Sequence, residues 1–455
     1  MKNITLTLIV FSCFILNCFA QRGEVDKVKI ASGGNLINLY KSGVAINKNS
    51  IDPQKEIVIY DANLKKTGTV RYSLDGKKEN IKTLCYDSTL NKILVFHGVD
   101  EVRNLTIIDP ETKKVQTLEI KAPSKQRMLG DVIFSLNKTS FILSHIYNED
   151  ININTIDTKT GEITKVELPE EWKKRTIQRV IKANSKYLAI CYKDKKIVNM
   201  ALMDDEGNIV EDKILTNNEN DFVIDPYLIT DIGNDEFAIV GNYRSEISSR
   251  FILGMFVAKI GRTQLKYIKY IEFNKISNFY NYLPDKKKDK VERQKSVNYV
   301  TLYHHVINMN GSLVVSAEFF YPTYKTFNNS NGDPAFNGYQ YTHAVVLGFN
   351  VSGEKEFEHC IPIHLGYKAL RVNQKLARYM VDGAVKLGYF SSDKVYSFSL
   401  KDGKIEPDNS RQEVLAETEK EDKDNIPLCW YNNYYYQTMY NEQESAVYLI
   451  KFGIE

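Results

Sequence analysis

The chain has 455 residues, of which 60 are Lys or Arg and 57 are Asp or Glu, so its formal net charge is +3. This near balance gives no reason to expect nucleic acid as a partner, because proteins that bind it carry a marked excess of basic residues. A chain of this length can also bury a sufficient apolar core without disulfides or a structural metal.

The first twenty residues have the pattern of a cleavable export signal. Lys2 supplies a positive start, Leu6 to Leu16 form an uncharged apolar run, and Ala20 ends a short polar break. A helix over this run would span about 17 Å, well short of the roughly 30 Å of a bilayer core, so a transmembrane anchor is the less favoured interpretation. We expect cleavage after Ala20, which leaves residues 21–455 as a single mature domain.

Cleavage before Gln21, in a chain rich in Asn, Lys, Ile and Tyr, resembles the exported proteins of Bacteroidota. The resemblance implies a periplasmic or extracellular protein. No later stretch approaches the roughly 18 apolar residues of a spanning helix, so no transmembrane segment is expected in the mature chain. Lipid anchoring at Cys18 is an alternative, but Asn17 stands where a lipoprotein motif has a small residue.

A repeat of 48 residues organises the first half of the chain. Alternating apolar segments end at Asp61, at Asp109, at Asp157 and at Asp204 or Asp205, and 48 residues separate each of Asp61, Asp109, Asp157 and Asp205 from the next. Turn-forming residues and a second alternating segment follow each Asp. Because the carboxylate can accept a backbone N–H two residues on, we expect these Asp residues to hold hairpin turns rather than to act in catalysis.

The hairpins continue more loosely around Lys259, Asn350 and Ser399 and at the C-terminal end, which makes eight positions in all. Another apolar pair precedes most of them, so each unit has four strands. This resembles a β-propeller: an all-β ring of about eight four-stranded blades, with seven as the alternative. The last unit stops after its third strand, and the spare segment from Val25 to Ala31 is expected to complete it and close the ring. No WD dipeptide or other blade signature indicates a specific family.

Four cysteines remain after the signal, and each lies more than 60 residues from the next, without a CxxC pair. This spacing supports neither a zinc finger nor a thioredoxin-type site. An oxidising compartment permits disulfides, but free thiols are the favoured interpretation.

The sixth unit is enlarged, since 91 residues separate Lys259 from Asn350. It holds two insertions: residues 276–298, with a lysine-rich run from Asp285 to Lys295, and residues 322–340, rich in Asn and Gly. Because binding residues concentrate in long loops on a rigid scaffold, we place the function of the protein in this unit.

Two groups of side chains in this unit are candidates for a site. Imidazoles and a carboxylate could exchange protons, and the candidates for such catalysis are His304, His305, Glu318 and His343. Adjacent residues of a strand point to opposite faces, so His304 and His305 are not expected to face one site unless the strand bulges. Aromatic rings could stack on sugars or anchor a protein partner, and the candidates for such binding are Tyr321, Tyr324, Phe327, Phe336, Tyr339 and Tyr341.

The sequence contains no GxSxG elbow, HExxH helix, phosphate-binding Gly loop or GxGxxG fingerprint, so it predicts no catalytic motif, metal site or cofactor. Propellers assemble their sites from single residues of several blades, which leaves an enzyme possible. Three functions stay open. The favoured one is an exported binding module that recognises a glycan, peptide or envelope partner through the sixth blade. The others are a polysaccharide hydrolase or lyase with a His/Glu site and a structural subunit of an envelope assembly.

Overall fold

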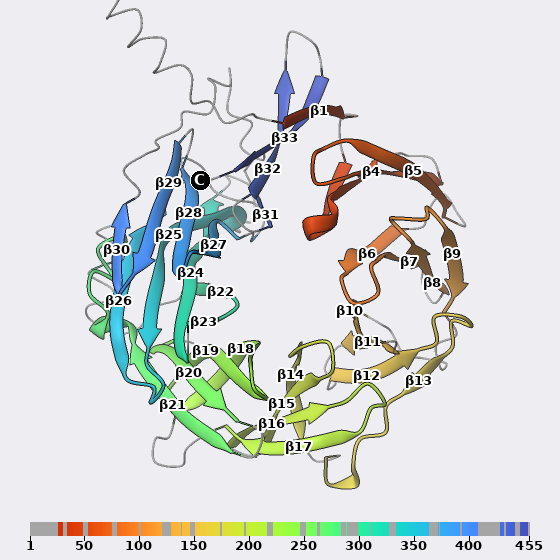
Figure 1. Ribbon diagram of the computed structural model, residues 1–455. Helices are drawn as coiled ribbons and strands as arrows, with labels where there is room; N and C mark the ends of the chain where they lie inside the picture. The colour runs from red at the N-terminus through yellow and green to blue at the C-terminus, as the bar shows by residue number, and fades with distance from the viewer. Residues whose placement is uncertain are drawn as a thin grey trace, which may run out of the picture.

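The protein forms eight antiparallel sheets arranged as blades around a central axis, so it is an eight-bladed β-propeller (Figure 1). This confirms the predicted fold class and excludes the seven-bladed alternative. The computed structural model describes residues 26–30, 34–48, 53–74, 80–99, 102–120, 129–137, 139–145, 151–172, 175–194, 197–215, 222–245, 252–261, 264–283, 288, 299–309, 311–326, 334–363, 372, 374–391, 394–407, 428–431, 434–441 and 446–453. The expected signal, residues 1–20, lies outside the described residues, as does the lysine-rich run apart from Lys288.

The first four blades have four strands each. Blade 1 consists of β2 (Gly34–Asn38), β3 (Val44–Lys48), β4 (Gln54–Tyr60) and β5 (Lys66–Ser73). Blade 2 consists of β6 (Asn80–Asp87), β7 (Lys92–Val99), β8 (Val102–Ile108) and β9 (Val115–Glu119). Blade 3 consists of β10 (Leu129–Leu136), β11 (Thr139–His145), β12 (Ile151–Ile156) and β13 (Ile163–Lys165). Blade 4 consists of β14 (Thr176–Lys182), β15 (Leu188–Asp194), β16 (Ile197–Met203) and β17 (Ile209–Ile214).

The other blades follow the same plan with one addition. Blade 5 consists of β18 (Val223–Gly233), β19 (Glu236–Arg244), β20 (Gly254–Ile260) and β21 (Leu265–Glu272). Blade 6 consists of β22 (Val300–Tyr303), β24 (Ser312–Thr326), β25 (Pro334–Phe349) and β26 (Lys355–Pro362), with the short β23 (Ile307–Met309) also paired to β24. Blade 7 consists of β27 (Leu376–Val381), β28 (Ala384–Ser391), β29 (Lys394–Lys401) and β30 (Lys404–Pro407). Three single-turn 3₁₀ helices, η1 (Tyr40–Ser42), η2 (Glu170–Trp172) and η3 (Phe273–Lys275), lie between strands.

Blade 8 closes the ring by joining the two ends of the chain. Its strands are β31 (Leu428–Tyr431), β32 (Tyr434–Asn441), β33 (Ala446–Gly453) and the N-terminal β1 (Asp26–Ile30). In the antiparallel β1–β33 pair, Asp26 faces Lys451 and Ile30 faces Val447. The indole Nε1 of Trp430 also donates to the Gly43 carbonyl of blade 1 at 2.9 Å. The N-terminal strand thus completes the last blade, as the sequence predicts.

The Asp turns between third and fourth strands have the geometry expected of them. The Asp109 carboxylate accepts the backbone N–H groups of Glu111 at 2.8 Å and Thr112 at 2.9 Å. In blade 4 the turn residue is Asp204, whose Oδ1 accepts from the Glu206 and Asn208 backbones at 3.0 and 2.8 Å. The repeat is therefore one residue short at this blade. Asp205 instead accepts from the Asn137 side chain of blade 3 at 2.7 Å.

The core lies between blades, because each sheet is covered on both faces by its neighbours. Strand β19 shows the consequence, since its residues 237–243 are all buried regardless of alternation. The largest cluster joins blades 5 and 6 and includes Met255, Phe279, Phe319 and Leu347. Two-sided burial accounts for the continuous apolar runs of the second and third strands.

Three cysteines, Cys85, Cys191 and Cys360, are free thiols. Burial raises the pKa of the Cys191 thiol to about 12 and that of Cys85 to about 11, which keeps both in the unreactive thiol form at neutral pH. No helix in the described part of the chain has the length and apolar character needed to cross a membrane.

Candidate functional site

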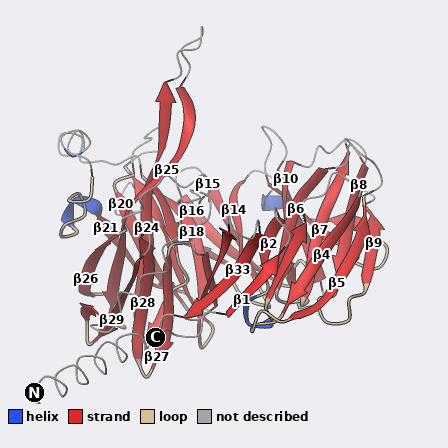
Figure 2. Cartoon of the chain, turned by 90° about the horizontal axis from the view of Figure 1, so that it is seen from above, coloured by secondary structure: helices blue, strands red, loops and turns tan. Residues whose placement is uncertain are grey.

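The longest strands of the protein, β24 and β25, extend beyond their blade as a two-stranded ribbon. Strand β22 pairs with β24 only as far as Phe320, and β26 pairs with β25 only as far as His343. Beyond these points the two strands continue to pair with each other, out to Thr326 opposite Pro334. We call residues 321–326 and 334–341 the arm, which projects from one end of the ring (Figure 2). The insertion expected as a loop at 322–340 is thus largely a β-ribbon.

The aromatic candidates divide into exposed and buried groups along the arm. Tyr324 and Phe336 face each other across the two strands, with ring centroids 6.1 Å apart, and they are 58% and 46% exposed. Tyr339 is half-buried, and its ring centroid lies 5.0 Å from that of Phe336. Tyr321 and Tyr341 are buried at the base of the arm, and Phe327 lies outside the described residues.

The edges of the arm are poorly suited to pairing with a further strand. Pro322 in β24 and Pro334 in β25 have no backbone N–H to donate, and the exposed Lys325 adds a charge to the edge. The register also shifts between Pro322 and Tyr324. The face that carries Tyr324 and Phe336 is therefore better suited to contact than either edge.

Side-chain hydrogen bonds hold the arm in shape. The Thr323 hydroxyl donates to the carbonyls of Asn337 and Gly338 at 3.2 and 2.8 Å. Gly338 has a φ of 90°, a conformation that glycine adopts without strain. At the base, Phe320 stacks on Tyr341 with centroids 4.8 Å apart. These contacts hold the backbone that carries the exposed rings of Tyr324 and Phe336.

The candidate His343 lies at the root of the arm in an aromatic cage. Its ring stacks on Phe319 at 5.0 Å and meets the edge of Phe279 at 4.6 Å, and its Nδ1 lies 3.0 Å from the Thr342 hydroxyl. Burial lowers the pKa of His343 to about 3, so its imidazole is neutral at physiological pH. Phe279 belongs to residues 276–283, the described part of the first insertion, which packs between blades 5 and 6.

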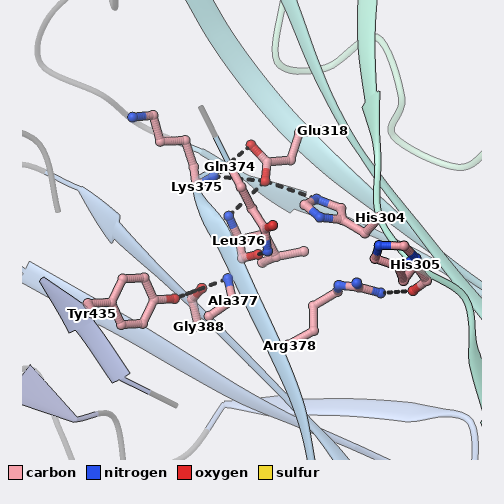
Figure 3. A network of polar contacts seen from close by, with 10 residues as sticks. All are labelled: His304, His305, Glu318, Gln374, Lys375, Leu376, Ala377, Arg378, Gly388 and Tyr435. Carbon is pink, nitrogen blue, oxygen red and sulfur yellow. Dashed lines mark hydrogen bonds and ion pairs between the residues drawn. The ribbon is translucent and has the colours of Figure 1, made fainter. Parts of the chain in front are cut away.

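The candidates His304 and Glu318 meet at the junction of blades 6 and 7 (Figure 3). His304 Nε2 lies 3.0 Å from Glu318 Oε1, and the two side chains are 2% and 0% exposed. The same oxygen accepts the backbone N–H groups of Lys375 at 2.9 Å and Leu376 at 2.8 Å. Burial lowers the pKa of His304, and the contact with Glu318 opposes this only in part. Through these three polar contacts the buried Glu318 carboxylate links blade 6 to blade 7. Neither Glu318 nor His304 is accessible to a substrate.

Strand β27 is held from its other side as well. The Tyr435 hydroxyl of blade 8 accepts the Ala377 backbone N–H at 3.0 Å and donates to the Gly388 carbonyl at 2.6 Å (Figure 3). Arg378 donates to the backbone carbonyl of His305. Blades 6, 7 and 8 are thus connected through one polar network.

The four catalytic candidates do not form one group. His305 is exposed and lies near Thr230 of blade 5, with Nδ1 and the hydroxyl 3.5 Å apart, whereas the neighbouring His304 turns into the protein. His343 pairs with Phe319 in register, one position from Glu318, and therefore lies on the opposite face of the sheet. Among the described residues, no three His, Cys, Asp or Glu side chains gather as they would around a metal ion.

Sequence reasoning did not identify the partners of Glu318. Lys375 and Leu376 bind Glu318, and Ala377 binds Tyr435, through backbone N–H groups, which leave no signal in residue type. Tyr435 stands in an aromatic cluster of the last blade, and its hydroxyl could have suggested a buried hydrogen bond.

No family model and no curated protein matches this chain. Solved structures with a similar arrangement include the WD40 domain of SCAP from fission yeast, with 12% identity over 94% of this chain and 98% of that one and a TM-score of 0.48. They also include the Dos1 propeller, with 11% identity over 93% and 94% of the two chains and a TM-score of 0.45. The polysaccharide lyase Uly1 has 10% identity over 94% and 99% and a TM-score of 0.44. Likeness at this level carries no argument about ligand or reaction.

Proposed function

We propose that this chain is an exported binding module for a protein of the cell envelope, and that the arm of blade 6 is its recognition element. The observation that carries the proposal is the exposure of Tyr324 and Phe336, 58% and 46%, on strands whose other large apolar side chains are mostly buried. Export is supported by the first twenty residues, which resemble the signals of exported Bacteroidota proteins.

The shape of the arm favours a protein partner over a small ligand. Small-molecule sites are concave and enclose most of the ligand, whereas the arm projects away from the ring (Figure 2). Large aromatic side chains on a projecting element act as anchors that fill pockets of a partner protein. The Thr323 hydrogen bonds hold the two strands of the arm in place before a partner binds. Less conformational entropy is therefore lost on binding.

The proposal is tested by photo-cross-linking in the native cell envelope, with a photoreactive phenylalanine derivative in place of Tyr324. We expect a discrete cross-link to one envelope protein. The matched control is the same derivative at Tyr40, which is 54% exposed and lies at the opposite end of the ring. It should not give that product.

The cross-linked protein is then purified and titrated with the mature chain. Replacing both rings, Tyr324→Ala with Phe336→Ala, should weaken Kd at least about 30-fold, the loss expected for a pair of anchor residues. The same Kd for the double variant and the wild type, or equal cross-linking from positions 324 and 40, would overturn the proposal.

A further inference from the structure

A pocket of about 340 Å³ lies between blades 1 and 2. Its floor is apolar and consists of Leu39, Ile59 and Pro110, all of them buried. It opens beside η1 and the β4–β5 and β8–β9 turns. These turns join first to second and third to fourth strands, whereas the arm joins a second strand to a third. The pocket and the arm therefore lie at opposite ends of the ring.

The wall of the pocket is polar and carries one charge of each sign. Ser42 and Thr67 contribute hydroxyls, Glu111 a carboxylate and Lys113 an ammonium group. Lys113 Nζ donates to the Thr67 hydroxyl at 3.2 Å and to the Pro110 carbonyl. The wall thus offers hydrogen-bond donors and acceptors with no net charge.

Two tyrosines, Tyr40 and Tyr86, are neighbours of the lining residues in sequence or through hydrogen bonds, although neither lines the pocket itself. Tyr40, between the lining residues Leu39 and Ser42, is 54% exposed, and its ring centroid lies 6.2 Å from that of Tyr86. The Tyr86 hydroxyl donates to Asn91 at 2.8 Å, and the Asn91 amide donates to Glu111 at 2.6 Å. A chain of hydrogen bonds therefore positions the Glu111 carboxylate at the pocket.

The backbone of Lys113 adopts a left-handed conformation that costs a lysine some strain. Lys113 has a φ of 63°, and its N–H bonds to the Asp109 carbonyl at 2.9 Å. At the equivalent point of blade 3 the same bond is made at 2.8 Å by Gly161, which has a φ of 74°. Glycine adopts this conformation freely and lysine does not. Blade 2 thus keeps a lysine where turn geometry alone favours glycine.

The geometry points to a binding site for one uncharged sugar residue in this pocket. A pyranose ring has an apolar face that suits the apolar lining residues Leu39, Ile59 and Pro110. Its hydroxyl groups both donate and accept, as do the groups of the wall. The cancelling charges of Glu111 and Lys113 favour no ionic ligand, and the volume lies at the lower end of the range for small-ligand sites. This site is independent of the arm and its protein partner.

The test is an NMR titration of the mature chain with the methyl glycosides of glucose, galactose, mannose and N-acetylglucosamine and with 1,4-linked disaccharides of glucose. We expect saturable binding of at least one, with Kd on the order of 1 mM for so small a ligand. Glucuronate, glycine and dialanine serve as the anionic and zwitterionic alternatives and should bind at least tenfold more weakly.

Three variants of the pocket and one control variant separate binding from folding. Lys113→Gly should weaken Kd at least tenfold while the melting temperature stays or rises, because glycine relieves the backbone strain. Glu111→Gln should also weaken binding, whereas Glu206→Gln, at the same turn position of blade 4, should leave Kd unchanged. Gly68→Val should reduce binding by displacing Lys113, whose Cε would lie 2.6 Å from the new Cβ.

Failure of every neutral sugar to bind, preferential binding of a charged compound, or full affinity in Lys113→Gly and Glu111→Gln would overturn the inference. The arm variant Tyr324→Ala with Phe336→Ala should bind the sugar normally. A failure of the arm proposal would therefore not be mistaken for a failure of this one.

Discussion

Blades 4 and 6 follow the same four-stranded plan and differ in where their second and third strands end. In blade 4, β15 and β16 have 7 residues each and stop at the limit of the ring. In blade 6, β24 and β25 have 15 and 16 residues and continue past their outer neighbours. Length inside the ring is buried between blades and stabilises the fold, whereas the added length exposes Tyr324 and Phe336. The comparison indicates that ring residues carry stability, and under our proposal the arm residues carry binding.

The largest expected effect concerns His343, inside the ring at the root of the arm. Its folded pKa is about 3, against about 6.5 for an unfolded histidine. Between these values the unfolded state binds more protons, so stability present above about pH 6.5 is lost as the pH falls, by about 4 kcal/mol near pH 3. Urea unfolding at pH 7, 5.5 and 4 should show this slope, and His343→Phe should reduce it. An equal slope in the variant would show that other groups cause the loss.

Removal of the blade 6–7 junction should have the next largest effect. Glu318→Ala leaves two buried backbone N–H groups without their acceptor and removes the carboxylate oxygen 3.0 Å from His304 Nε2, at a cost of about 2–5 kcal/mol in the free energy of unfolding. Glu318→Gln retains one carbonyl oxygen and should cost less. Glu272→Ala is the matched control, since its partner Lys275 is exposed, and it should change stability by less than about 0.5 kcal/mol. Equal losses of stability in Glu318→Ala and Glu272→Ala would show that the blade 6–7 junction does not stabilise the ring.

Replacing the turn Asp of a regular blade should have a smaller effect on stability, and the neighbouring Asp205 provides a matched control. Asp204→Ala removes the acceptor of two backbone N–H groups and should cost about 1–2 kcal/mol. Asp205→Ala removes one bond to an exposed amide and should cost less than about 0.5 kcal/mol. Thermal unfolding of both variants measures the difference. The reverse order would assign the turn to Asp205.

Apart from the controls Glu272→Ala and Asp205→Ala, the smallest expected effect on stability is that of the arm. The double variant Tyr324→Ala with Phe336→Ala should change the free energy of unfolding by less than about 1 kcal/mol, because both rings are largely exposed. Urea unfolding measures this change. A loss comparable to that of Glu318→Ala would show that the arm supports the ring, and the contrast between the two regions would then fail.

The ring could be predicted from sequence because its determinants are local and repeated. Asp61, Asp109 and Asp157 accept backbone N–H groups a few residues on, so their spacing reports the blades directly. Closure of the ring by β1 could be predicted because the last unit of the sequence stops after its third strand. The arm was expected as a loop because residues 322–340 are rich in Asn and Gly, which are typical of turns. Pairing of β24 with β25 overrides these preferences, and the register shift next to Pro322 accommodates the proline.

The polar contacts between blades could not be predicted, because they join residues far apart in the chain. Glu318 meets the backbone at 375 and 376, and Tyr435 meets Ala377. His304 is buried and His305 is exposed, but both follow the end of β22, so strand alternation is not the cause of their opposite orientation. Alternation does separate His343 from Glu318, since Phe319 is the residue that faces His343.

The central claim is that the arm binds the partner and that the ring folds without it. The most direct measurement uses a chain in which Asn-Gly replaces residues 322–339 and joins Tyr321 to Gln340, which already face each other, through a two-residue turn. We predict that this chain keeps the melting temperature of the wild type and binds the protein cross-linked at position 324 at least about 30-fold more weakly. Unchanged affinity, or a ring that no longer folds, would contradict the claim.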